Sequence, residues 1–231
     1  MIGGLAAAAL VPFAGSSGGN VDRLRPLPKE GETPQPTATS VSVKTYPGEP
    51  ALALDPSRQY FAVIKTAKGD IRLELFDDLA PRAVNSFLFL AQEGFYTGLT
   101  FYRVLPNFVA QAGDPTCDAN AQFGCTGTGG PGYLLPLEEN GQLTHVQGAV
   151  AFAAVAGSSS TTSGSQFYLL LSDSPTLNGE DTVFGRIVAG LDVAQKLIQR
   201  NPCFEASSSQ NPCEESPPLG DQILSVSVEV V

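Results

Sequence analysis

Residues 101–115, which read FYRVLPNFVAQAGDP, are the stretch that decides the fold of this chain. If the stretch formed one extended strand, Arg103, Val109 and Gln111 would point to the same face, because side chains alternate along a strand. Pro106 interrupts such a strand, since proline fixes φ and has no N–H to donate to a neighbour. The pattern therefore predicts two short strands with a tight bend, whose shared face carries a cation, an apolar side chain and an amide.

A cation and an amide on one strand face allow two interpretations, and the spacing does not choose between them. In the first, Arg103 pairs with a carboxylate and Gln111 lies at the rim of the core. In the second, both side chains lie at the edge of a small apolar pocket, where a guanidinium and an amide would contact a ligand.

The same stretch resembles the signature of the cyclophilins, the peptidyl-prolyl cis–trans isomerases, whose usual form is close to F-H-R-V-I-x-x-F-M-x-Q-G-G-D. Further segments are similar to those of the family in the same order, and together they cover roughly residues 58–231. These segments are KGDI at 68–71, LELF at 73–76, AP at 80–81, GTGG at 127–130, GSQFY at 164–168, LNG at 177–179 and VFG at 183–185.

The resemblance implies a mainly β fold, a closed eight-stranded antiparallel β-barrel capped by two α-helices. The residue pattern agrees with it. Alternating runs at 61–66 and 70–76 predict a β-hairpin, and Pro81 suits the first turn of a helix that ends near Gly94. A barrel of this size is filled by its own side chains, so a substrate has to bind in a groove on the outside.

The resemblance also implies which residues act on a substrate. Arg103 would be the catalytic cation, and Gln111 would be its catalytic partner and hold a backbone carbonyl of the substrate. The implied substrate-binding residues are Phe108, Val109, Gly127, Ala153, Ala154, Gln166, Phe167, Tyr168, Leu177 and Asp181. Within this set, the proline pocket would consist of Phe108, Val109, Phe167 and Leu177, with Tyr168 at the position of a family phenylalanine.

Four further positions depart from the family pattern. Tyr102 replaces the histidine beside the arginine, and Val109 replaces a longer methionine at the pocket floor. Thr176 stands where many members have a tryptophan that contributes to cyclosporin binding, so we expect weak binding of that drug. Asp181 replaces a histidine at the pocket edge, where a carboxylate would compete for Arg103 or repel acidic substrates.

The four cysteines form two pairs that are close in sequence. Cys117 and Cys125 flank one inserted segment, and Cys203 and Cys213 flank another. This spacing suits two local disulfides that pin loops and favours an oxidising compartment. Free thiols and a metal site are the alternatives, although one histidine and no CxxC motif leave the usual metal-ligand spacing missing.

The N-terminal part differs in composition from the rest. Residues 1–20 are uncharged and apolar at their centre, which is typical of a signal-like or anchor segment. Residues 21–57 are rich in Pro, Ser and Thr and are interpreted as a linker, and residues 58–231 as the isomerase domain. Together with the cysteines, this predicts an extracytoplasmic location: periplasmic, secreted or membrane-anchored facing outside.

The charge and the residue types narrow the chemistry. A formal net charge of -10 argues against nucleic acid as a partner. No paired-carboxylate motif, nucleophile–base pair or metal set is present, and no cofactor is expected. The predicted function is peptidyl-prolyl cis-trans isomerisation of proline-containing peptides and unfolded proteins by a monomer that assists the folding of exported proteins. The alternative is a binding module or chaperone for Pro-containing segments with little turnover.

Overall fold

The computed structural model describes residues 44–118, 125, 127–139, 141–203 and 213–231. Every described residue belongs to one unit of the chain, Ala38–Val231, referred to below as the second unit. The predicted signal-like segment 1–20 and the first part of the predicted linker 21–57 lie outside the described residues. None of the described helices has the length and apolarity needed to cross a membrane.

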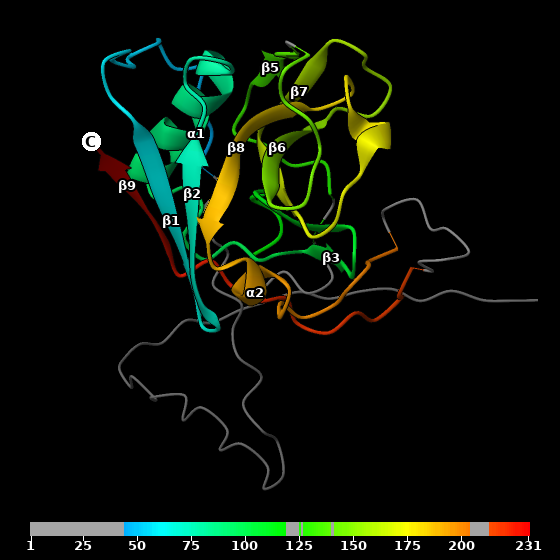
Figure 1. Ribbon diagram of the computed structural model, residues 1–231. Coiled ribbons are helices and arrows are strands. Elements are labelled where there is room, and N and C mark those ends of the chain that lie inside the picture. The colour runs from blue at the N-terminus through cyan, green and yellow to red at the C-terminus, as the bar shows by residue number, and fades with distance from the viewer. Residues whose placement is uncertain (1–43, 119–124, 126, 140, 204–212) are drawn as a thin grey trace, which may run out of the picture. The chain divides into compact units, whose positions relative to one another are not determined.

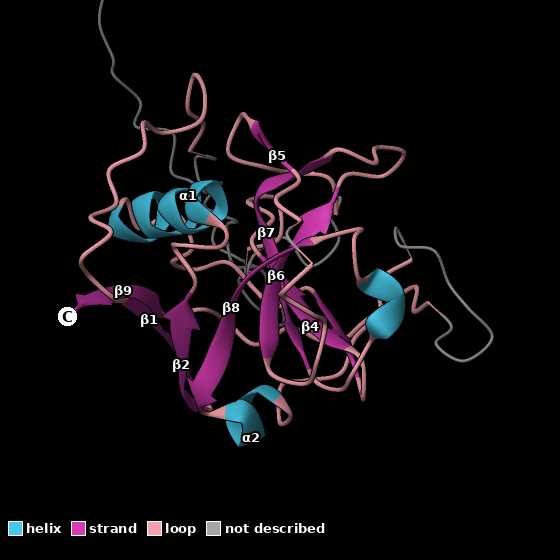
Figure 2. Cartoon of the chain, turned by 45° about the horizontal axis from the view of Figure 1, so that its top comes forward, coloured by secondary structure: helices cyan, strands magenta, loops and turns pink. Residues whose placement is uncertain are grey.

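The second unit is mainly β, as predicted. Its elements, in chain order, are β1 (Tyr60–Thr66), β2 (Gly69–Leu75), α1 (Pro81–Gln92), β3 (Arg103–Leu105), β4 (Val109–Ala112), β5 (Leu134–Pro136), β6 (Ala149–Ala154), β7 (Thr161–Leu170), the 3-10 helix η1 (Pro175–Leu177), β8 (Thr182–Ala189), α2 (Leu191–Ala194) and β9 (Ser225–Val230). The two α-helices lie at opposite ends of the sheet (Figures 1 and 2).

All nine strands belong to one antiparallel sheet, in which the order of paired strands is β3-β4-β7-β6-β8-β2-β1-β9 and β5 pairs with β7. The predicted hairpin is β1–β2, with Tyr60 opposite Leu75 and Thr66 opposite Gly69. The expectation of eight strands in a closed barrel is met only in part. The described sheet has nine strands, and its path of strand pairs has β3 at one end and β9 at the other.

The segments that precede these two end strands contact each other. Thr100 and Gln222 form an isolated antiparallel bridge. The backbone N–H of Ile223 donates to the carbonyl of Leu99 at 2.8 Å, and that of Phe101 donates to the carbonyl of Asp221 at 2.9 Å. A short backbone link therefore joins the approach to β3 with the approach to β9.

The main core lies between the sheet and α1, which packs against β7, β8 and β9. Alternate residues of β1 and β2 are buried there, as the period of a strand requires. Aromatic rings fill the centre, with the ring of Phe87 on α1 5.1 Å from Tyr96, 5.4 Å from Phe167 and 5.3 Å from Phe184. These large apolar side chains supply most of the stabilising buried area.

Residues 44–57 were expected to belong to the linker, but several residues between Tyr46 and Ala53 contact α1. The ring of Tyr46 lies 5.0 Å from that of Phe89. Asn85 accepts a hydrogen bond from the N–H of Ala53 at 3.0 Å and donates to the carbonyls of Pro50 and Ala51 at 3.2 and 3.1 Å. These contacts place the start of the packed region before the predicted boundary at residue 58.

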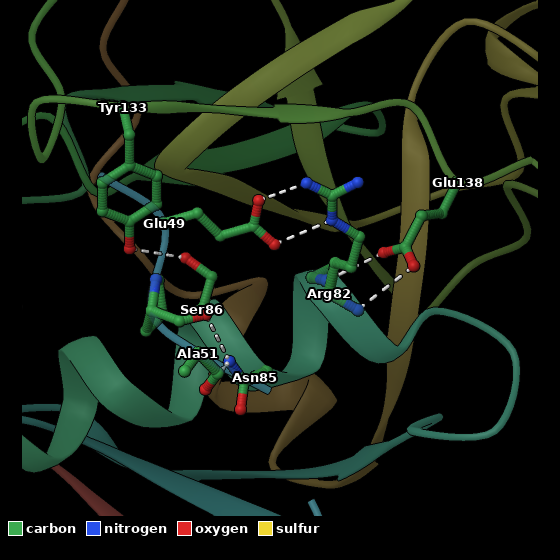
Figure 3. A network of polar contacts seen from close by, with 9 residues as sticks. Glu49, Ala51, Arg82, Asn85, Ser86, Tyr133 and Glu138 are labelled. Atoms are coloured by element: carbon green, nitrogen blue, oxygen red, sulfur yellow. Dashed lines mark hydrogen bonds and ion pairs between the residues drawn. The ribbon is translucent and has the colours of Figure 1, made fainter. Parts of the chain in front are cut away.

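Figure 3 shows the polar contacts around the N-terminus of α1. Nε of Arg82 donates to Glu49 at 2.7 Å. The N-cap residue, Ala80, makes no side-chain hydrogen bond, and the carboxylate of Glu138 accepts the N–H groups of Arg82 at 3.1 Å and Ala83 at 2.8 Å instead. A residue distant in sequence thus satisfies the free donors of the first turn.

Candidate active site

Arg103 and Gln111 lie directly opposite each other on β3 and β4. The bend predicted at Pro106 brings them together, and Asn107 there has a φ of 56°, the left-handed conformation that asparagine tolerates in turns. Nη1 of Arg103 donates to Oε1 of Gln111 at 3.4 Å. Gln111 is buried and Arg103 is half-buried, so the predicted catalytic pair shares one site.

The guanidinium of Arg103 keeps donor capacity for a ligand. In the part of the chain that the structure describes, no ion pair involves this arginine. Its Nε is buried and makes no hydrogen bond to any described residue, and its Cζ lies 5.8 Å from the centroid of the Phe108 ring. The interpretation in which Arg103 pairs with a carboxylate is therefore wrong for the described residues.

A hydrogen-bonded chain extends from Gln111 into the protein. Nε2 of Gln111 donates to the hydroxyl of Tyr102, which donates to Oε1 of Gln166 at 2.6 Å. Nε2 of Gln166 donates to the carbonyls of Gly127 at 3.1 Å and Gly129 at 2.7 Å. The amide group of Gln111 thus contacts Tyr102, whereas the sequence led us to expect it to hold a substrate carbonyl.

Tyr102 is the residue that sequence reasoning missed. It was treated only as a departure from a histidine, yet its ring is fully buried and its hydroxyl joins two glutamine side chains. The available signal was its chemistry, because a buried tyrosine needs a hydrogen-bond partner for its hydroxyl and two amide residues occur nearby in the motifs.

An apolar cluster lies beside these polar groups and separate from the main core. It contains Val109, Ala149, Ala151, Tyr168, Leu170 and Val183, with Phe108, Leu143, Ala153 and Leu177 packed against it. Strand pairing explains why the cluster lies close to the predicted catalytic pair, because Gln111 on β4 is opposite Tyr168 on β7. Five of the predicted substrate-binding residues therefore share this cluster: Phe108, Val109, Ala153, Tyr168 and Leu177.

Phe167 does not belong to this cluster, although the sequence placed it in the proline pocket. It is fully buried in the main core, where its ring lies 5.4 Å from that of Phe87 and 5.5 Å from that of Tyr96. The reason is strand alternation, since neighbours on β7 point to opposite faces. Tyr168 occupies the face that carries Gln166, and Phe167 faces α1.

Asp181 holds two parts of the cluster together. One carboxylate oxygen accepts the hydroxyl of Tyr168 at 2.9 Å, and the other accepts the backbone N–H of Ala154. Burial raises the pKa of Asp181 above its ordinary value, and it also raises the pKa of Tyr168 with a further contribution from the Asp181 charge. We expected the Asp181 carboxylate to compete for Arg103, but among the described residues no ion pair joins the two side chains.

The glycine-rich loop at residues 127–130 is also held by Asp114, which follows β4. The N–H of Gly129 donates to Asp114 at 2.9 Å, and a Cβ at this position would lie 2.1 Å from an Asp114 oxygen, so a larger residue would displace that carboxylate. Cys117 and Cys125 form a disulfide just before the loop, and Cys203 and Cys213 form a second one. The described residues include no group of three or more His, Cys, Asp or Glu side chains placed to hold a metal ion.

Comparisons with known proteins agree with this geometry. Residues 61–228 match the family described as cyclophilin type peptidyl-prolyl cis-trans isomerase/CLD. A peptidyl-prolyl cis-trans isomerase of Helicobacter pylori is 46% identical over 142 residues, which are 60% of this chain and 80% of that protein. Isomerase B of Bacillus subtilis is 44% identical over 128 residues, which are 55% of this chain and 82% of that protein.

Solved structures show the same relationship. A Cryptosporidium parvum cyclophilin type isomerase has a TM-score of 0.58 and 27% sequence identity, covering 74% of this chain and 98% of its own. The same protein in the presence of the dipeptide Ala-Pro also scores 0.58, with 27% identity and coverage of 73% and 98%. The chain therefore belongs to the family of cyclophilin-type peptidyl-prolyl cis-trans isomerases.

Proposed function

We propose that this isomerase accelerates rotation about X-Pro bonds by directing the guanidinium of Arg103 at the prolyl nitrogen. The single observation that carries this proposal is that Arg103, beside the apolar cluster of Val109 and Tyr168, has no carboxylate partner among the described residues. Its charge meets a neutral amide instead of a carboxylate within the described residues, and its Nε is buried without a partner.

The physics of the reaction explains why a lone cation suffices. The barrier of about 18–20 kcal/mol arises from conjugation of the nitrogen lone pair with the carbonyl, and the uncatalysed rotation takes tens of seconds or more. A guanidinium that draws the lone pair onto nitrogen favours the twisted amide. About a thousandfold acceleration requires roughly 4 kcal/mol, which one charge-assisted hydrogen bond in a water-poor site can approach.

The substrate contacts follow from the cluster. A proline ring would pack on Phe108, Val109, Tyr168 and Leu177, while Phe167 supports the cluster from the core side. Ala153 and Ala154 at the end of β6 would border the same site, where the N–H of Ala154 donates to Asp181. Gly127 would line a neighbouring subsite, and Gln111 would orient Arg103.

A refolding assay limited by proline isomerisation tests the role of Arg103. We expect the native protein to speed refolding and Arg103→Ala to lose about a hundredfold or more of that acceleration. Arg72→Ala is the matched control, because Arg72 is a surface arginine paired with Glu229 at 2.9 Å. Equal rates for the native protein and Arg103→Ala would refute catalysis by this residue. No acceleration by the native protein would support the second candidate, a binding module for Pro-containing segments with little turnover.

Several finer features also belong to this proposal. The backbone link between Thr100 and Gln222 would close the sheet into a barrel. The protein would act as a monomer on unfolded proteins as well as on short peptides. The exposed Thr176, in place of a tryptophan, would give weak binding of cyclosporin, which a titration with the drug can measure.

We propose an extracytoplasmic location, periplasmic, secreted or anchored facing outside, where the chain would assist the folding of exported proteins. The two disulfides support it, because such bonds persist in oxidising compartments. Thiol blocking without reductant, followed by mass spectrometry of protein from its native source, should find no labelled cysteine. Labelling of all four cysteines would remove the argument.

A further inference from the structure

We propose that Tyr102 is a positioning residue for the isomerase reaction: its buried hydroxyl fixes which end of the Gln111 amide faces Arg103. The proposal rests on the role of Arg103 proposed above and extends it to a residue that contacts neither the substrate nor the prolyl nitrogen. Its basis is a series of hydrogen bonds in which the donor and acceptor roles at one bond fix the roles at the next.

The chain starts at two backbone carbonyls. The carbonyl oxygens of Gly127 and Gly129 can only accept hydrogen bonds, so the side chain of Gln166 must present its nitrogen to them. The carbonyl end of the same amide then faces Tyr102, at 2.6 Å from its hydroxyl. The orientation of Gln166 is therefore set by the backbone of the glycine loop.

The hydroxyl of Tyr102 passes this orientation on. Its single proton is donated to Oε1 of Gln166, so its oxygen can act toward Gln111 only as an acceptor. Gln111 must present its nitrogen to Tyr102, which leaves Oε1 directed at Nη1 of Arg103, 3.4 Å away. In the reversed orientation, the amide N–H groups of Gln111 would face the guanidinium, which accepts no hydrogen bond.

Burial makes these hydrogen bonds decisive for the orientation of the Gln111 amide. Tyr102 is fully buried, and Gln111 and Gln166 are 7% and 6% exposed, so water has little access to replace a lost partner. The contact between Arg103 and Gln111 is already long at 3.4 Å. Nε2 of Gln111 also lies 3.4 Å from Oε1 of Gln166, so without the hydroxyl the amide would move toward Gln166 and lose Arg103.

Tyr102→Phe is the first test, since it removes only the hydroxyl. We expect kcat/KM for a proline-containing peptide to fall about fivefold, the size of one lost hydrogen bond. Tyr96→Phe is the matched control, because Tyr96 is equally buried and its hydroxyl has no partner among the described residues. It should retain kcat/KM within about twofold.

A double-mutant cycle separates positioning from a general loss of stability. If Tyr102 acts through Gln111, adding Tyr102→Phe to Gln111→Ala should change kcat/KM by less than about twofold. The NMR signals of the Gln111 side-chain amide and of the Arg103 Nε–H should also lose order in Tyr102→Phe and stay unchanged in Tyr96→Phe. A full additional fivefold loss in the double variant, or unchanged Gln111 and Arg103 signals, would overturn the proposal.

Two further variants keep the result interpretable. If Tyr102→Phe does not fold, Gln166→Met breaks the chain at its previous member and should lower kcat/KM in the same way, while full activity would refute the proposal. Arg103→Ala is measured alongside. Native activity in Arg103→Ala would mean that the proposed function has failed, whereas a loss there together with native activity in Tyr102→Phe would overturn the positioning role alone.

Discussion

Arg103 and Gln111 occupy opposite positions on β3 and β4, and the guanidinium of the first donates to the amide oxygen of the second at 3.4 Å. A neutral amide can hold a guanidinium in place without neutralising its charge. A carboxylate would hold the guanidinium and also neutralise it. The pairing therefore leaves Arg103 oriented and still able to stabilise charge that develops on a substrate.

Arg103→Lys should lower kcat/KM by about tenfold to a hundredfold while leaving the unfolding free energy nearly unchanged. Lysine keeps the positive charge but loses the planar fork that lets one end contact Gln111 while the other faces the substrate. The measurement is a protease-free peptide isomerisation assay, with Arg72→Lys as a control on an exposed arginine. Wild-type activity in Arg103→Lys would show that the orientation of a planar guanidinium is unimportant for the reaction.

Asp181→Asn should change how stability depends on pH. Burial raises the pKa of Asp181 above its ordinary value of 3.8, so the native state holds the proton more tightly than the unfolded state does. The resulting stabilisation is complete below pH 3.8 and is lost as the pH rises through the native pKa. Asparagine does not titrate, so the stability of the variant relative to the native protein should rise with pH over that range.

Urea unfolding at several pH values tests this expectation. Asp192→Asn provides a control of opposite sign, because the hydrogen bond and charge of Lys196 lower the pKa of Asp192. That small stabilisation is present above pH 3.8 and is lost as the pH falls through the native pKa, so Asp192→Asn should lose relative stability as the pH rises. Parallel pH curves for Asp181→Asn and the native protein would contradict the role of burial.

Asn85→Ala should release the segment 44–55 from α1. The side chain of Asn85 makes three hydrogen bonds to the backbone of this segment, so we expect a loss of about 1–3 kcal/mol of unfolding free energy and faster tryptic cleavage after Lys44. Gln92→Ala, an exposed amide at the end of the same helix, should change neither. Unchanged protection of the segment in Asn85→Ala would show that other contacts hold it.

Glu138→Ala should destabilise the start of α1 by about 1 kcal/mol. Its carboxylate accepts two N–H groups of the first helical turn (Figure 3), and no other side chain caps this end in the described structure. Hydrogen exchange of the Ala83 amide and urea unfolding measure the effect. Glu139→Ala serves as the comparison, since Glu139 is exposed and bonds only Gly141; an equal loss in both variants would argue against capping.

Local patterns in the sequence predicted a large part of the fold and of the site. Alternation predicted the β1–β2 hairpin, and Pro81 marked the start of α1. The interruption at Pro106 predicted the two strands that bring Arg103 opposite Gln111. These features depend on neighbours in sequence, where residue type and spacing carry the information. The motif predicted Phe167 for the proline pocket, and the structure places its ring in the main core. A motif gives residues without the face to which each one points.

The sequence by itself determined the family and the elements that carry the motifs, and it singled out Arg103 as the candidate catalytic cation. Only the tertiary structure decided that residues between Tyr46 and Ala53 contact α1, that Glu138 caps that helix and that Tyr102 lies between Gln111 and Gln166. The physical reason is that each of these contacts joins side chains or backbone whose partners are set by packing across the sheet and the helix, and no local pattern of charge or hydrophobicity specifies them.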